Sequence, residues 1–190
     1  MYMKNLYSFI TVIFISVLFT GFIFPINASA NTAATSAALI PLVESEDTDD
    51  IEHIKTLQAF LAKKNSPLAP YAKTFVDEAK KNNLDWRLVA AISGLESSFG
   101  IHIPTNSYNG WGFGVYGDNV RRFESWDDGI TVVSTALRKD YMNKWGATSV
   151  AEIGRIYAAS PTWAVRVQYF INSIDEFEEN QDRTTLALSL

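Results

Sequence analysis

Glu96 is the residue whose type and position best suit acid catalysis. The sequence predicts a helix from an Asp85 cap to about Phe99. At 3.6 residues per turn, Glu96 lies about 80° around this helix from Leu88, so it borders the apolar face instead of opposing it. Partial desolvation there raises the pKa of a carboxyl group and keeps it protonated near neutral pH, as a general acid requires. On this geometry alone, a surface glutamate beside a core helix is the stronger interpretation.

An apolar period of 3.6 residues dominates residues 51–178 and predicts a mainly α domain. Six helices are expected, each with its own start signal. Two of these signals have the spacing of a capping box, Ser125 with Asp128 and Ser149 with Glu152. The six expected starts are Asp49 or Asp50, Pro70, Asp85, Ser125, Ser149 and Pro161.

Residues 101–124 interrupt the helical pattern. Glycines alternate with aromatic residues in this stretch, which favours a loop or a short β-hairpin over a helix. A loop of this kind has no core of its own to fill, so it is a natural place for a binding surface. Its glycines and aromatics are Gly110, Gly112, Gly114 and Gly117 with Tyr108, Trp111, Phe113, Tyr116 and Phe123.

The two ends of the chain have their own patterns. Residues 1–30 resemble a signal peptide, with an apolar run followed by Ala28-Ser29-Ala30 as a cleavage site. An uncleaved membrane anchor is the alternative, because the run approaches the ~20 residues of a membrane span. Residues 31–50 turn acidic after a stretch rich in small residues and are expected to form a flexible linker, and residues 179–190 a disordered tail.

Composition excludes several classes of protein. The chain has 16 Lys and Arg against 21 Asp and Glu, a net charge of −5, and no basic block, so nucleic acid is not an expected partner. It has no cysteine, which excludes thiol nucleophiles and thiolate metal sites. Its two histidines, His53 and His102, lack the spacing of metal ligands, so we expect no metal.

Four segments, in order over roughly residues 84–175, resemble one family of cell-wall enzymes. The first, residues 88–100, contains Leu-Glu-Ser-Ser-Phe-Gly and is similar to the catalytic helix of lysozyme-like muramidases, lytic transglycosylases and bacterial glucosaminidases. The other three are Asn106-Ser107-Tyr108-Asn109-Gly110-Trp111-Gly112, Arg122-Phe123-Glu124-Ser125-Trp126-Asp127-Asp128-Gly129-Ile130 and Ile156-Tyr157-Ala158-Ala159-Ser160-Pro161-Thr162-Trp163. Together they resemble the bacterial endo-β-N-acetylglucosaminidase-like family of the lysozyme-like superfamily.

The resemblance implies a lysozyme-like helical domain over residues 51–178, with the glycine-rich and aromatic-rich stretch as its insert. It implies hydrolysis of the β-1,4 glycosidic bond of peptidoglycan strands, with Glu96 as general acid, Tyr157 in the active site and no cofactor. We expect a monomer that is secreted and associated with the cell wall, reaching the membrane only through an uncleaved N-terminal segment. The residues expected to contact substrate are Ser97, Asn106, Tyr108, Trp111, Phe113 and Trp163.

The second catalytic group stays open at this point. Glu124 has no capping duty and is the preferred second carboxylate, whereas Asp127 and Asp128 suit the start of a helix. An inverting, a retaining or a substrate-assisted mechanism fits the residues, and in the last of these Tyr157 orients the N-acetyl group of the substrate.

Two other functions also stay open. A lytic transglycosylase would use the same acid, although the Met-Gln pair that many of them carry after the catalytic helix is absent. A non-catalytic peptidoglycan-binding module would keep the fold alone. Asn109 stands where the family usually has an aromatic residue, which puts one sugar-stacking contact in question.

Overall fold

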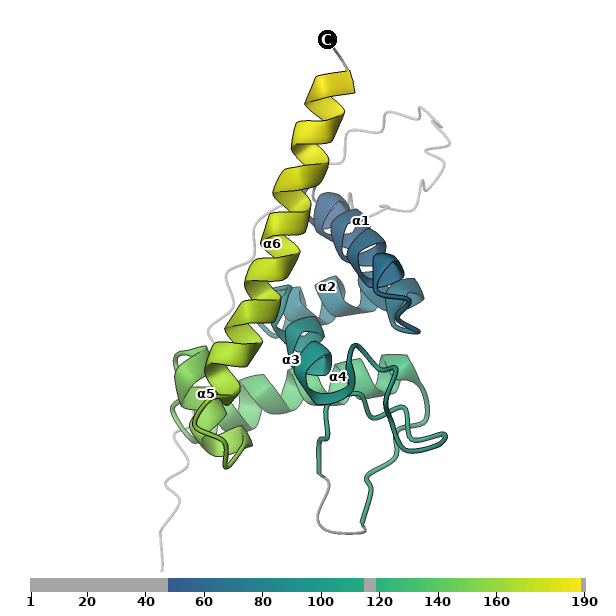
Figure 1. Cartoon of the computed structure of the whole chain (residues 1–190). Coiled ribbons are helices and arrows are strands. Elements are labelled where there is room, and N and C mark those ends of the chain that lie inside the picture. Colours follow the sequence, from purple (N-terminus) through teal and green to yellow (C-terminus); the bar gives the residue numbers. More distant parts are fainter. Residues whose placement is uncertain (1–47, 115–118, 189–190) are drawn as a thin grey trace, which may run out of the picture. The chain divides into compact units, whose positions relative to one another are not determined.

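The computed structural model describes residues 48–114 and 119–188, and this described part is mainly helical and contains no strand (Figure 1). The expected signal peptide and most of the expected linker lie outside the described residues. The elements in chain order are α1 (Thr48–Lys63), the 3₁₀ turn η1 (Ala69–Tyr71), α2 (Ala72–Lys81), α3 (Leu88–Ser97), α4 (Trp126–Ala136), the π-helix η2 (Leu137–Lys144), α5 (Val150–Tyr157) and α6 (Trp163–Leu188).

Two of the helix starts follow the capping chemistry of the sequence, whereas the expected Asp85 cap is wrong, because α3 begins at Leu88 without a side-chain cap. Ser125 caps α4 by accepting a hydrogen bond from the Asp128 N–H at 3.1 Å. Ser149 caps α5 in the same way, with the Glu152 N–H at 3.3 Å. Both capping predictions are confirmed.

Three boundaries differ from the prediction. α1 begins at Thr48, so Asp49 and Asp50 lie in its first turn, where carboxylates interact favourably with the helix dipole. α6 continues as helix to Leu188 through residues expected to be disordered, because pairs four residues apart such as Glu179 and Arg183 (2.9 Å) support its last turns. The predicted fourth helix is α-helical only to Ala136, where α4 ends, and it continues directly as the π-helix η2. A 3.6-residue period does not distinguish a π-helix from continued α-helix.

α3 is the central element of the described fold. It contacts α2, α4 and α6 (Figure 1), and its residues 88–94 are all buried. A helix surrounded in this way is apolar on every face until it ends. α3 therefore carries Glu96 from the core to the surface, at the last residue but one of the helix.

The chain leaves α3 through an unusual turn. Ser98, Phe99 and Gly100 all have positive φ, at 52°, 58° and 81°. The left-handed conformation is unfavourable for residues with a Cβ, so the turn needs tertiary support. Ser66, in the loop after α1, supplies it by donating its hydroxyl to the Phe99 carbonyl at 2.7 Å. The direction of the chain just after Glu96 is therefore fixed from a distant part of the sequence.

Gly129 tests how closely α4 packs against the segment that follows α3. A Cβ at Gly129 would lie 2.7 Å from the Trp111 ring and 3.0 Å from the Tyr108 carbonyl oxygen. We expect Gly129→Ala to destabilise the protein, because overpacking of about 1–3 kcal/mol outweighs the gain of up to about 1 kcal/mol in helix propensity. Urea unfolding measures the change, with the exposed Lys139→Ala as control, and equal stability of Gly129→Ala and wild type would contradict the packing.

Candidate functional site

The two carboxylate oxygens of Glu96 have different surroundings. Oε1 accepts a hydrogen bond from the indole N–H of Trp163, at the start of α6, at 2.7 Å. Oε2 faces the backbone of Gly112, where an added Cβ would lie 3.5 Å away, and it has no hydrogen-bond partner within the described part of the chain. One oxygen is thus fixed in direction by a buried indole, while the other lies beside bare backbone.

The pKa of Glu96 is raised above its usual value, and desolvation is the main cause. The Trp163 hydrogen bond and the positive charge of Arg166 act in the opposite direction and lower it. Although the residue as a whole is solvent-exposed, desolvation prevails over both. The pKa of Glu96 therefore lies above its usual value, the direction that a general acid requires, and Arg166 is a contributor that the sequence did not indicate.

Tyr157, at the end of α5, forms a cluster with Glu96, Trp163 and Trp111, in which its ring and its hydroxyl make separate contacts. The ring stacks on Trp163, with centroids 4.9 Å apart and planes at 26°, and its hydroxyl donates to the Trp111 carbonyl at 2.7 Å. Desolvation raises the Tyr157 pKa well above its usual value, and the negative charge of Glu96 raises it further. Tyr157 therefore stays protonated and acts as a donor.

The structure corrects the role expected for the side chain of Trp111. Its ring is 0 % exposed and packs against Phe75, Phe123 and Trp126, while its N–H donates to the Val89 carbonyl of α3 at 2.9 Å. A ring with no exposed face cannot stack on a ligand. Trp111 belongs to the core and reaches the cluster through its backbone carbonyl alone.

Trp163 and Ser97 also take positioning roles in place of the expected substrate contacts. The Trp163 ring is 3 % exposed, so what it offers the site is the N–H held on Glu96. Ser97 is 4 % exposed, donates to the Gly110 carbonyl at 2.7 Å and accepts from the Gly100 N–H at 2.8 Å. Ser97 therefore ties the end of α3 to the loop that passes Glu96.

Asn109 organises the same loop, a role that sequence reasoning missed. It is buried, and its side-chain amide donates to the carbonyls of Phe113 and Arg121 at 2.9 and 3.0 Å. Its side-chain oxygen accepts from the Phe113 N–H at 3.0 Å. A buried amide that bonds to both limbs of a loop fixes their separation. Asn109 therefore has a structural role in this chain.

The remaining predicted residues lie outside the cluster around Glu96. Asn106 and Glu124 are exposed, and the hydrogen bond of Glu124 is a backbone one, from its N–H to Asp128 at 3.1 Å. Tyr108 is 37 % exposed with its edge toward Trp126, and Phe113 is half-buried beneath Arg121. Tyr108 keeps an exposed ring that can meet a ligand.

The described residues contain no group of three or more His, Asp or Glu side chains placed to hold a metal ion. Nor does this part of the chain include a helix that is long and apolar enough to cross a membrane. No known family model matches the sequence, and no curated protein matches it. The function is therefore inferred from the residues and their geometry.

Replacing Trp163 by Phe isolates the hydrogen bond to Glu96. An aromatic ring is kept and the indole N–H is lost, so the ionised carboxylate loses a stabilising donor and the pKa of Glu96 rises further. A titration of the Glu96 carboxyl carbon by NMR measures this shift. Trp86→Phe is the matched control, since Trp86 stacks on His53 at 4.4 Å, and an unchanged Glu96 pKa in Trp163→Phe would show that the bond does not influence the acid.

Proposed function

We propose that this protein hydrolyses the β-1,4 glycosidic bond of peptidoglycan strands, as an endo-β-N-acetylglucosaminidase with a lysozyme-like helical domain. The observation that carries the proposal is Glu96, a carboxyl group with a raised pKa, one oxygen held by Trp163 and the other beside the backbone of Gly112. The four sequence segments that resemble the family support it, since Glu96, Trp111, Tyr157 and Trp163 come from three of them and lie in one cluster. Export to the cell wall through the N-terminal segment belongs to the same proposal.

In the proposed reaction, protonated Glu96 donates its proton from Oε2 to the glycosidic oxygen, and the bond from that oxygen to the anomeric carbon breaks. As that bond breaks, the carbonyl oxygen of the substrate's own N-acetyl group bonds to the anomeric carbon. Water then replaces this oxygen at the anomeric carbon and returns a proton to the carboxylate. Because the acid must carry the proton, the raised pKa extends activity toward higher pH, and activity falls as Glu96 ionises. Tyr157 and Trp163 hold the acid and the loop in place while charge develops.

The second group in this reaction is proposed to be the N-acetyl group of the substrate. A two-carboxylate mechanism places its partner within ~5–9.5 Å of the acid. Glu124, exposed and without a contact to the cluster, is therefore assigned no chemical step.

Glu96→Gln tests the acid. We expect a loss of cleavage of about 10²- to 10⁴-fold, because the amide cannot donate the proton, while binding of glycan strands is retained. Mass spectrometry of fragments released from purified peptidoglycan is the measurement, with Glu52→Gln, an exposed residue on α1, as control.

The products separate the alternatives. Reducing N-acetylglucosamine ends that vanish in Glu96→Gln support the proposal, whereas anhydromuramic ends would assign the protein to the lytic transglycosylases. Undiminished cleavage by Glu96→Gln would refute the site. Absence of fragments from folded wild-type protein would indicate a binding module.

Glu124→Gln tests the assignment of the second group. A substrate-assisted reaction leaves its rate within about threefold of wild type, whereas loss of a carboxylate nucleophile or base lowers it by at least about 10²-fold. Initial rates on the same peptidoglycan decide between the two results. A large loss would restore the two-carboxylate mechanism, provided that thermal unfolding shows the variant to be folded.

A further inference from the structure

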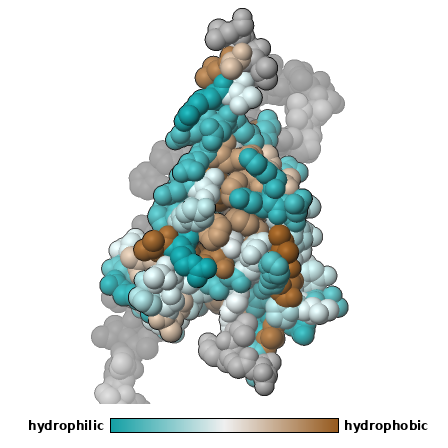
Figure 2. All heavy atoms as spheres, viewed as in Figure 1, coloured by the Kyte–Doolittle hydropathy of each residue, from teal (hydrophilic) through white to brown (hydrophobic). Residues whose placement is uncertain are grey.

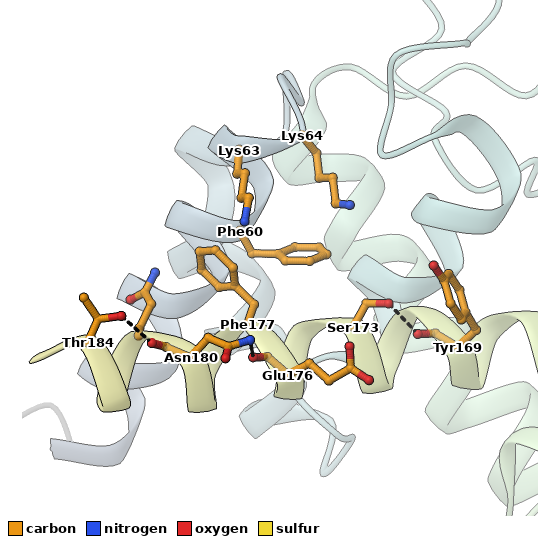
Figure 3. A pocket seen from close by; sticks show the side chains of 10 residues that line it. Phe60, Lys63, Lys64, Tyr169, Ser173, Glu176, Phe177, Asn180 and Thr184 are labelled. Atoms are coloured by element: carbon orange, nitrogen blue, oxygen red, sulfur yellow. Dashed lines mark hydrogen bonds between the residues drawn. The ribbon is translucent and has the colours of Figure 1, made fainter. Parts of the chain in front are cut away.

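A concave region lies along α6, beyond the residues that contact Glu96. It is a groove of about 620 Å³ between α1 and α6, termed the α1–α6 groove. Figure 3 shows Phe60 and Phe177 between the two helices, Lys63 and Lys64 on the α1 side, and Tyr169 at one end. Neither the proposed reaction nor the sequence motifs assign a role to this groove.

One face of α6 connects the groove to the acid. Trp163 donates a hydrogen bond to Glu96, and the positive charge of Arg166 lowers the Glu96 pKa. Further along α6, Tyr169, Ser173 and Glu176 follow Arg166 at intervals of three or four residues. Such spacing keeps side chains on one face of a helix. At 1.5 Å per residue, the distance along α6 from Trp163 to Phe177 is about 21 Å, longer than a disaccharide.

Aromatic packing connects the two regions a second time. Phe99, three residues after Glu96, packs against Phe170 at 5.3 Å and against Phe60 at 5.4 Å, and Phe60 in turn packs against Phe177 at 5.6 Å. Figure 2 shows a band of apolar atoms between α6 and α1 on the face where α3 ends, bordered by hydrophilic atoms on both sides. The groove and the site of Glu96 are therefore supported by the same layer of rings.

The side chains of the groove define what it can bind. Tyr169 is 67 % exposed, with Phe170 against it at 5.4 Å, so its ring offers an aromatic face at the surface. The ammonium groups of Lys63 and Lys64 lie over the rings of Phe177 and Phe60, at 5.3 and 5.4 Å, which holds two positive charges at the rim. Glu176 adds a hydrogen-bond acceptor. A chain of sugars with carboxylate-bearing substituents matches all three features.

We propose that the α1–α6 groove binds further saccharide units of the strand that is cleaved at Glu96, with Tyr169 stacking on a sugar and Lys63 and Lys64 contacting carboxylates. This inference rests on the proposed function. It assigns the protein long strands as preferred substrates, because only they reach from Glu96 into the groove.

The test uses two variants of the full mature chain and a matched control. Tyr169→Ala removes the stacking face, and the double variant Lys63→Gln, Lys64→Gln removes the charges while keeping a polar side chain at each position. Lys55→Gln, exposed elsewhere on α1, is the control. Initial rates are measured on peptidoglycan strands fractionated by length, and thermal unfolding is recorded for each variant.

Tyr169→Ala should lower kcat/KM for long strands about fivefold to tenfold, as loss of one aromatic contact implies, and leave the shortest cleaved oligomer unaffected. The Lys variant should show the same length dependence, weakened by added salt. Equal effects on all lengths, or none on long strands, would overturn the groove assignment while leaving the acid assignment intact.

A binding measurement keeps the inference separate from catalysis. Glu96→Gln protein is titrated with peptidoglycan strands and with uncharged N-acetylglucosamine oligomers by calorimetry. Tyr169→Ala added to this background should weaken both, and the Lys variant should weaken only the charged strands. If wild-type protein cleaves nothing, the proposed hydrolysis fails and this titration alone decides on the groove. Unchanged affinity, or a dimer that Tyr169→Ala dissociates, would refute glycan binding there.

Discussion

The buried indole of Trp111 is the contact on which the geometry of the site depends. Its N–H bonds to α3 and its carbonyl accepts from Tyr157 of α5, so one residue links the helix that carries Glu96 to the cluster that surrounds it. Its ring packs among aromatic residues of α2 and α4 and of the loop. Removing such a side chain would affect three elements at once. The bare backbone beside Glu96 at Gly112 exists because the preceding residue is anchored in the core.

Electrostatics at the site follow from this packing. A loop held close to the end of α3 excludes water from one side of the carboxyl group, and desolvation then outweighs the indole donor and the arginine that favour ionisation. Burial also raises the pKa of Tyr157, so its hydroxyl stays protonated near neutral pH and donates to the Trp111 carbonyl of the loop. The raised pKa values of Glu96 and Tyr157 thus have the same main cause, desolvation.

The sequence predicted those features that depend on local chemistry. The caps at Ser125 and Ser149 were correct because a capping hydrogen bond spans three residues, and Glu96 was placed at the edge of an apolar face by helix geometry alone. Trp111 was assigned to the surface because a loop aromatic gives no local sign of folding back into the core. The contribution of Arg166, 70 residues from Glu96 along the chain, depends on the packing of α6 against α3, which no local pattern encodes.

The left-handed turn after α3 has a consequence for the order in which the molecule acquires its structure. The hydrogen bonds within the helix join residues close in sequence, but the turn is secured by Ser66, 33 positions before Phe99. Loop closure over that distance carries an entropic penalty that is offset only once α1 has packed. A chain with its helices formed but this closure missing would have Glu96 without its surroundings. Ligands recognised at Glu96 therefore bind the completed native state and, by mass action, protect it against partial opening.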